Sequence, residues 1–446
     1  MFRTFAGAIF LIVLFAPIVI DAQFLSPEER SRLEAEYNQL QKEIVEWQKV
    51  LDETKAKKNT LQGDVTTLNA QIKQAEAQIR QKNIAISGLS VEIRSKTEHI
   101  GKLSLRMQET MDSLASLMRR TDEMDRISLV ALAIGSTDFS AFFLEADTIL
   151  TLEARLEETI DELQTIRSET EQERAALAEK KDAEVDARYV VESKKQQIAK
   201  SEAGKRELLT ITKNQEEGYQ KVLAERQRRA EAIRNALFPL RDAEGIPFGT
   251  ALDHAALASQ KTGVRTALIL AVLSQESDLG KNVGQCYVAS LSTGEGVGKN
   301  TGRVFSNTMK VPRDTVPFER ITSALGLAWA TSPVSCPVGG KGYGGAMGPS
   351  QFIPSTWELF APKLKSSLGV AQPNPWDAKH AIMATAIYLA DLGAGSQTYS
   401  AERNAACRYY SGRSCDTRSP INYTYGNAVI AKAERFQEDI DFLKGV

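Results

Sequence analysis

The stretch Thr266-Ala-Leu-Ile-Leu-Ala-Val-Leu-Ser-Gln-Glu-Ser-Asp-Leu-Gly280 is typical of an almost entirely apolar helix that ends on an acid. Glu276 lies three and four residues beyond Leu273 and Val272, so these side chains share one helix face. A carboxylate on an apolar face is poorly solvated, which raises its pKa. A raised carboxyl pKa suits a general acid for glycosidic bond cleavage. The ordinary alternative for one acid near a helix end is a solvated surface or capping role.

Length and charge indicate more than one domain and give no sign of a binding partner with strong charge. The chain has 446 residues, which is more than one ordinary domain. Its formal net charge of -2 gives no indication of binding to nucleic acid or to an anionic membrane surface.

Residues 1–22 are typical of a secretory signal peptide. Arg3 supplies one positive charge, residues 4–20 are almost wholly apolar, and Asp21-Ala22-Gln23 follows. We expect cleavage near Ala22. The alternative is an uncleaved membrane anchor, because the apolar run nearly reaches spanning length. Both readings place the rest of the chain outside the cytoplasm, in the periplasm, cell envelope or medium.

All four cysteines lie beyond residue 280, and an extracytoplasmic setting favours disulfides. They are Cys286, Cys336, Cys407 and Cys415. Four cysteines allow three pairings. We favour Cys286–Cys336 and Cys407–Cys415, because the second pair closes a short loop. The alternative is that all four are free buried thiols.

Residues 23–237 predict a long antiparallel coiled-coil hairpin. No proline occurs over 28–238, and the composition is rich in strong helix formers. Apolar residues recur at alternating spacings of three and four from Leu33 to Leu117, which is the pattern of a coiled-coil seam. Polar residues interrupt this seam at Thr54, Lys58, Lys82, Lys96 and Thr110. A helix of roughly 90 residues, about 135 Å long, needs a second helix to cover its seam. A second helical run over 150–237 provides that partner.

An apolar segment at about 126–149 interrupts the two arms. Gly135 can end a helix there, and we expect small apolar helices at this end of the hairpin. Three phenylalanines are too apolar for an ordinary solvated loop. They are Phe139, Phe142 and Phe143. They form either a small core that closes the hairpin or a protein-docking patch.

In its layout, this half resembles the coiled-coil hairpin of secreted murein-hydrolase regulators of the EnvC and PcsB type. The resemblance covers roughly residues 26–237. It implies that the hairpin docks on the extracellular part of an FtsEX-type division transporter.

Residues 238–446 are rich in glycine, proline and aromatic residues, which indicates a globular domain. No run of alternating strand residues stands out, so we expect a mainly helical domain and an all-α fold for the chain. The predicted helices are 250–262, 265–277, 318–330, 354–367, 377–393, 401–410 and 425–444.

The most specific motif is Tyr343-Gly-Gly-Ala-Met-Gly-Pro-Ser-Gln-Phe-Ile-Pro-Ser-Thr-Trp357. Its glycines allow a tight turn that lets the backbone approach a ligand closely, and Pro354 suits the first position of a helix. Gln351 and Phe352 place an amide beside an aromatic face, which suits sugar hydroxyls and sugar rings. The alternative is a helix-initiating turn with a structural glutamine.

Three motifs together resemble the lytic murein transglycosylases. They are Leu273-Ser-Gln-Glu-Ser277, Gly344-Gly-Ala-Met-Gly-Pro-Ser-Gln-Phe-Ile-Pro-Ser355 and Arg408-Tyr-Tyr-Ser-Gly412. The sequence looks most like the membrane-bound lytic transglycosylase B type, within the lysozyme-like superfamily. The resemblance covers roughly residues 240–440.

The resemblance implies roles for the matching residues. Glu276 corresponds to the sole catalytic acid/base, Ser277 to the serine that steadies the site, and Tyr409 to the tyrosine that faces the acid. Substrate-binding residues are expected at Ser277, Tyr343, Met347, Gln351, Phe352, Tyr409, Tyr410 and Tyr425. The family often has Tyr-Asn where this chain has Tyr409-Tyr410, so the group that contacts the sugar there stays open.

The number of candidate catalytic acids distinguishes hydrolysis of the glycosidic bond from transglycosylation. A hydrolysing glycosidase usually needs two carboxylates. The other candidates, Asp278, Glu295 and Asp377, lie outside any matching catalytic motif, and surface or capping roles are expected for them. By resemblance, Glu276 protonates the oxygen between MurNAc and GlcNAc and then accepts the proton of the MurNAc C6 hydroxyl. This predicts a peptidoglycan lytic transglycosylase for cell-wall remodelling or division, targeted or regulated by its coiled coil. The alternatives are a non-catalytic glycan-binding scaffold that activates other murein hydrolases, and ordinary hydrolysis.

Other chemistries fit less well. The histidines are His99, His254 and His380, and they show neither an HxH nor an HExxH spacing for zinc. No P-loop or dinucleotide-binding fingerprint occurs. We therefore expect no metal and no cofactor.

Overall fold

A computed structural model describes residues 61–125, 139–210, 245–340 and 342–445, with isolated positions at 39–45 and 221–228. The predicted signal peptide lies outside the described residues. The chain divides into two compact units, which are described separately. The first comprises Met1–Asp52 and Ala70–Lys180, and the second comprises Glu53–Asn69 and Lys181–Val446.

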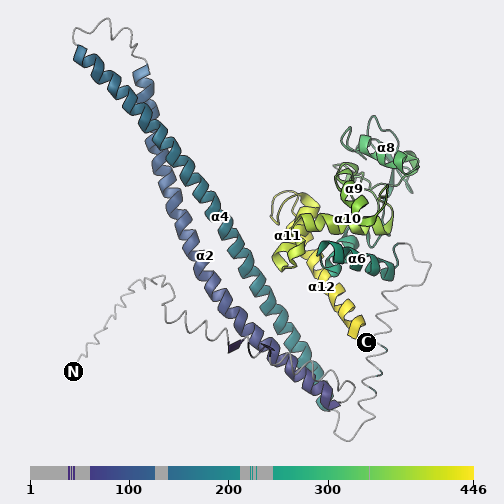
Figure 1. The fold of residues 1–446 in the computed structure, drawn as a ribbon. Coiled ribbons are helices and arrows are strands. Elements are labelled where there is room, and N and C mark those ends of the chain that lie inside the picture. The colour runs from purple at the N-terminus through teal and green to yellow at the C-terminus, as the bar shows by residue number, and fades with distance from the viewer. Residues whose placement is uncertain are drawn as a thin grey trace, which may run out of the picture. The chain divides into compact units, whose positions relative to one another are not determined.

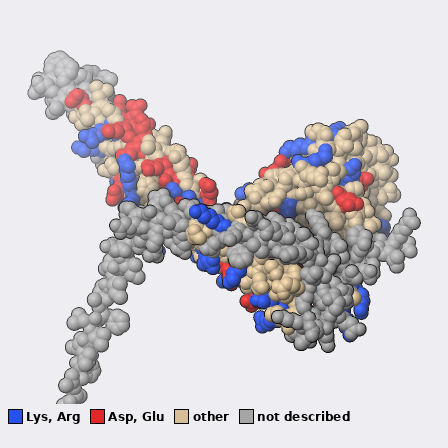
Figure 2. All heavy atoms as spheres, turned by 60° about the horizontal axis from the view of Figure 1, so that its bottom comes forward, with Lys and Arg blue, Asp and Glu red and all other residues tan. Residues whose placement is uncertain are grey.

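Two long helices form the predicted hairpin: α2 (Leu61–Asp125) and α4 (Phe139–Thr210) (Figure 1). Ion pairs within the first unit join the two helices. They are Glu92–Lys180, Lys96–Glu173 and Arg106–Glu162. Residue numbers rise along α2 as they fall along α4, so the helices are antiparallel. Figure 2 shows acidic and basic side chains interspersed along the hairpin surface.

The seam of the hairpin is apolar with a few satisfied polar residues. Ile72, Leu103 and Ile166 are buried in it. Thr110, which interrupts the predicted seam, is also buried, and its hydroxyl donates to the backbone oxygen of Arg106 at 2.9 Å. Because that bond is made within its own helix turn, the threonine does not leave an unpaired polar group in the seam.

The return helix starts earlier than the sequence predicts. α4 begins at Phe139 instead of near residue 150, so the expected short helices over 139–149 are part of one long helix. The turn at 126–138 and the side chains of the three phenylalanines lie outside the described residues. No helix in the described part of the chain is long and apolar enough to span a membrane.

The globular part of the second unit is built from seven helices among the residues described there. They are α6 (Phe248–Thr262), α7 (Thr266–Ser277), α8 (Thr315–Ala324), α9 (Pro354–Leu368), α10 (Ala378–Asp391), α11 (Tyr399–Ser411) and α12 (Tyr423–Gly445). These agree with the predicted helices except that α8 ends early. Gly326 has a φ of +67° just beyond it, and a separate 3-10 turn, η2 (Trp329–Thr331), follows.

Helix α7 is the centre of this domain. Every residue from Ala267 to Leu273 is 0% exposed. α6, α10 and α12 pack around it. A helix that is apolar on all sides must be surrounded by other elements, which explains why this stretch shows no polar face.

A small antiparallel sheet completes the domain. Its strands, β1 (Cys286–Val288), β2 (Gly296–Gly298) and β3 (Val304–Phe305), lie in the order β1-β2-β3. Strands of two or three residues are too short for a period-two pattern, so the sequence did not indicate them. The domain is nevertheless mainly helical, as predicted.

Both disulfides that the sequence favours are present. Cys286 bonds to Cys336, which ties β1 to the segment before the glycine motif. Cys407 bonds to Cys415, which ties the last turns of α11 to the loop that follows. No free cysteine occurs among the described residues.

Candidate active site

Glu276 lies in the last turn of α7, where the buried helix reaches the surface of the domain. Burial raises the pKa of its carboxyl to about 7, and a hydrogen bond from Tyr425 opposes this rise. The carboxyl therefore changes protonation state near neutral pH, as a group that both donates and accepts a proton requires.

Tyr425, in the first turn of α12, is the direct partner of the acid. Its hydroxyl donates to Oε1 of Glu276. Burial and the nearby Glu276 charge raise the pKa of Tyr425 well above its usual value, so the phenol stays protonated and remains a donor. Tyr410 stacks on Tyr425, with ring centroids 4.8 Å apart and an interplanar angle of 13°. Since Tyr410 is 50% exposed, one aromatic surface beside the acid is open to solvent.

Tyr409, in α11, is fixed behind this pair. Its hydroxyl donates to the backbone oxygen of Ser350 at 2.8 Å. Burial raises the pKa of Tyr409 well above its usual value, and the nearby Glu276 charge adds to the rise. The resemblance implies that this tyrosine faces the acid; the Glu276 charge does act on it, but the hydroxyl that bonds Glu276 belongs to Tyr425.

Two buried hydroxyl residues that the sequence analysis missed support Tyr409. The Ser350 hydroxyl donates to the backbone oxygen of Ala381 at 2.7 Å and accepts from the Thr385 hydroxyl at 2.8 Å. Both side chains are almost fully buried. Thr385 could have been found as the one serine or threonine within the apolar run of α10.

Ser277 joins the acid-bearing helix to the glycine motif. Its hydroxyl donates to the backbone oxygen of Pro349 at 2.6 Å and accepts from the backbone N–H of Gly280 at 2.9 Å. The serine therefore fixes the end of α7 against the motif.

The glycine motif forms a tight turn beside this junction. Gly348 has a φ of +61°, and a Cβ there would lie 1.9 Å from the backbone oxygen of Pro375. Gln351 has a φ of +52°, and its amide donates to the Gly348 oxygen at 2.7 Å. The amide thus stabilises its own turn in this structure.

The remaining predicted substrate residues lie in two different places. Met347 and Phe352 are buried in the core, where the Phe352 ring lies 5.7 Å from that of Tyr409. Phe352 therefore packs against Tyr409 from within the core. Tyr343 is 56% exposed and lies beside Lys310. Among the contacts that the structure describes, none joins Tyr343 to Glu276.

Of the three other candidate acids, Asp278 and Asp377 have side-chain partners. Asp278 is ion-paired with Lys281 at 3.0 Å, and Asp377 caps α10 by accepting from the His380 N–H at 3.0 Å. Within the described part of the chain, no second carboxylate shifts the pKa of Glu276. The arrangement therefore presents one acid and its tyrosine partner.

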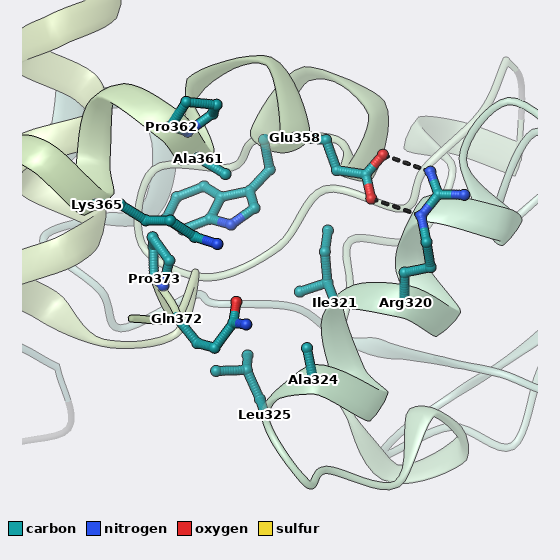
Figure 3. Close-up of a pocket in the computed structure, with 11 residues that line it drawn as sticks. Arg320, Ile321, Ala324, Leu325, Glu358, Ala361, Pro362, Lys365, Gln372 and Pro373 are labelled. Carbon is teal, nitrogen blue, oxygen red and sulfur yellow. Dashed lines mark hydrogen bonds and ion pairs between the residues drawn. The ribbon is translucent and has the colours of Figure 1, made fainter. Parts of the chain in front are cut away.

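A separate pocket of about 440 Å³ lies between α8 and α9 (Figure 3). Arg320 and Glu358 form a two-point ion pair at its wall, with distances of 2.6 and 2.9 Å. None of the predicted catalytic or substrate-binding residues lines this pocket.

Comparison with known families finds a model that matches part of the chain. The family model described as "Transglycosylase SLT domain" matches residues 187–402. The match begins within α4, includes Glu276 and the glycine motif, and ends before Tyr409. Residues 187–402 therefore carry the sequence features of a transglycosylase SLT domain. No curated protein matches the chain.

Two solved structures resemble the chain. One is the Escherichia coli lytic transglycosylase Slt35 in complex with calcium, with 18% identity, a TM-score of 0.22, and coverage of 37% of this chain and 49% of that chain. The other is a 36 kDa muramidase/transglycosylase, with 16% identity, a TM-score of 0.23, and coverage of 42% and 61%. The matched region spans less than two thirds of either relative.

Proposed function

We propose that this protein is a peptidoglycan lytic transglycosylase, of the membrane-bound lytic transglycosylase B type, fused to an EnvC-like hairpin. It cleaves the β-1,4 bond between MurNAc and GlcNAc and forms 1,6-anhydroMurNAc. The observation that carries this proposal is a single acid, Glu276, with a pKa of about 7 and a tyrosine donor on one oxygen. The transglycosylase SLT match over residues 187–402, which includes Glu276, supports it.

The reaction needs no second carboxylate and no water. Tyr425 donates to Oε1 of Glu276, so Oε2 is the oxygen that holds the proton for transfer. Protonation of the glycosidic oxygen lets the C1–O bond of MurNAc break. The C6 hydroxyl of the same MurNAc attacks C1, and the Glu276 carboxylate accepts the hydroxyl proton. The acid is thereby restored. Because the attacking hydroxyl belongs to the same sugar as C1, the enzyme does not have to bind and orient a water molecule.

The exposed face of Tyr410 is suited to a sugar ring. It stands over Tyr425, beside the acid. An aromatic surface at this position replaces the amide that the family often has. We infer that Tyr410 contacts the sugar next to the scissile bond.

The proposed location is extracytoplasmic. Peptidoglycan lies outside the cytoplasm, and the two disulfides are stable in that setting. The apolar N-terminal stretch is consistent with export, either as a cleaved signal or as an anchor.

Mass analysis of digested sacculi tests the activity. We expect the full chain to release muropeptides with anhydro ends, and the variant Glu276→Gln to lose this activity by about 100-fold or more. The variant Asp278→Asn, which removes a neighbouring exposed acid, serves as the matched control and should stay active. Reducing MurNAc ends would show hydrolysis instead.

The same experiment distinguishes the scaffold alternative. A non-catalytic glycan-binding protein would leave sacculi undigested by itself, and would activate other hydrolases equally well with Glu276→Gln. Equal effects of parent and variant would reject the enzymatic proposal.

We further propose that the hairpin binds a partner, by resemblance the extracellular domain of an FtsEX-type division transporter. Support comes from a groove of about 390 Å³ between α2 and α4 within the first unit. Met107, Met111, Met118 and Ile160 are among its lining residues. Flexible methionine side chains adapt to apolar partner surfaces.

Binding to the purified extracellular transporter domain tests this proposal. Met111 is 50% and Met118 57% exposed, so the double variant Met111→Asp, Met118→Asp should fold and should weaken binding by about tenfold or more. Leu105→Asp is the matched control, because Leu105 is 68% exposed on the same helix but does not line the groove. Equal affinities of the parent, the double variant and the control would refute a role of the groove.

A further inference from the structure

We propose that residues 186–200 of α4, the docking segment, bind the face formed by α11 and α12 and thereby position the tyrosines around Glu276. All of these residues belong to the second unit. The catalytic part of this inference rests on the proposed function, whereas the docking itself does not.

The first contact is a helix cap supplied by α4. Asp186 accepts from the backbone N–H of Ser400 at 2.7 Å and from its hydroxyl at 2.9 Å. Ser400 lies in the first turn of α11, where N–H groups have no partner within the helix. Thr398 caps a second N–H of the same turn, that of Ala401. A carboxylate at this end also interacts favourably with the helix dipole. Asp186 of α4 therefore stabilises the start of α11.

The second contact is aromatic and reaches both helices. Tyr189 stacks on Tyr399, with centroids 4.4 Å apart and an interplanar angle of 21°. The Tyr189 hydroxyl donates to Glu434 of α12. Burial and this bond raise the pKa of Tyr189 well above its usual value. One residue of α4 therefore contacts α11 and α12 at once.

A partly buried ion pair lies near Tyr189. Arg265, at the N-terminus of α7, binds Glu402 of α11 through two bonds of 2.9 and 2.6 Å. Glu402 is only 2% exposed, and the charges of both residues act on Tyr189. The docking segment thus covers a charged pair that fixes α7 to α11.

The docking segment acts at the N-terminal ends of α11 and α7, and the C-terminal ends of these two helices carry the candidate active site. Asp186 and Tyr189 meet the start of α11, and Tyr409 and Tyr410 lie in its last turns, about 15 Å further along the helix axis. α7 is arranged in a similar way, because Arg265 lies at its start and Glu276 lies at its end. Displacing α4 would therefore change the helices that place the acid and its tyrosines.

The family match gives independent support. It begins at residue 187, inside the docking segment, and not at the start of the globular domain. The outer contact, Lys200 with Glu438, joins two exposed side chains and by itself contributes little. It nevertheless offers a chemical probe of the docked state.

Carbodiimide cross-linking and amide exchange of the full chain test the docking. We expect a zero-length cross-link between Lys200 and Glu438 in the parent. In Asp186→Ala, the amides of residues 399–402 should exchange at least about tenfold faster, equivalent to about 1.4 kcal/mol. Tyr189→Phe keeps the ring and removes only the bond to Glu434. Glu192→Ala is the control, since the ion pair that this exposed acid makes among the described residues lies within α4, with Lys195.

The catalytic coupling has its own readout. In the double variant Asp186→Ala, Tyr189→Ala, digestion of sacculi should slow by about tenfold, because small displacements of catalytic groups have large effects on rate. The pH profile should change with it, since the Tyr425–Glu276 contact would be altered. Glu192→Ala should match the parent in both.

The outcomes distinguish failure of the docking, failure of the catalytic coupling and failure of the proposed function. An absent cross-link, with exchange in Asp186→Ala equal to that in Glu192→Ala, would refute the docking. Faster exchange with unchanged rate and pH profile would refute the coupling. A parent that releases no anhydro-muropeptides would refute the proposed function, while the cross-link and exchange data would still decide the docking.

Discussion

Glu276 owes its pKa to two opposing contacts. Burial at the end of α7 raises the pKa, and the hydrogen bond from Tyr425 lowers it, for a net value of about 7. The carboxyl therefore changes its protonation state near neutral pH. Since glycosidic cleavage begins with proton donation, kcat/KM should fall as the pH rises through about 7.

Replacing Tyr425 by phenylalanine should move this fall to higher pH. The hydroxyl stabilises the carboxylate, so its loss raises the pKa of Glu276 and keeps the acid protonated over a wider range. The measurement is the pH dependence of kcat/KM for release of anhydro-muropeptides. Tyr410→Phe is the matched control, because it keeps the ring stacked on Tyr425. A shift of the Tyr425→Phe profile to lower pH would contradict this assignment.

Among the elements, the turn of the glycine motif requires glycine for two reasons, a positive φ and the lack of room for a Cβ atom. Gly348 combines a positive φ with a close approach to the backbone of Pro375. Gly369 has a similar φ of +67° at the end of α9, but nothing lies within 4 Å of its added Cβ. The two positions therefore separate backbone strain from steric overlap.

Gly348→Ala should destabilise the domain more than Gly369→Ala. Each substitution adds the strain of a left-handed alanine, about 1–2 kcal/mol, and only the first also forces backbone atoms apart, which adds about 1–3 kcal/mol. Denaturant unfolding measures the difference. Equal losses of stability in the two variants would show that the approach to Pro375 has no energetic weight.

Helix positions were predictable from the sequence because their signals are local. Pro354 begins α9, and Gly412, with a φ of +72°, ends α11. The sheet was not predictable, since its strands are only two or three residues long. The early start of α4 was also missed, because Gly135 and the phenylalanines after it were interpreted as a break.

At the scale of the whole molecule, the disulfides should contribute unequally to stability. Cys286–Cys336 joins residues 50 positions apart, and Cys407–Cys415 joins residues 8 apart. In the chain-entropy description, closing the longer loop stabilises by about 4 kcal/mol and the shorter by about 2.5 kcal/mol.

Paired serine variants measure this difference. The melting temperature should fall further in Cys286→Ser, Cys336→Ser than in Cys407→Ser, Cys415→Ser. The sites are comparable, because Cys286 and Cys407 are both 0% exposed. A larger fall for the short-loop pair would mean that local support of α11 outweighs loop closure.

The sequence by itself determined most of the helices and the acid at the end of α7, because these depend on spacing along the chain. It favoured one cysteine pairing of three, and the structure shows that pairing. Only the tertiary structure decided which groups surround that acid. Tyr425, 149 residues away, bonds Glu276, while Tyr409 bonds the Ser350 backbone. Asp186 likewise caps a helix that begins more than 200 residues later. Such contacts arise from the packing of whole helices, and no local pattern of residues encodes them.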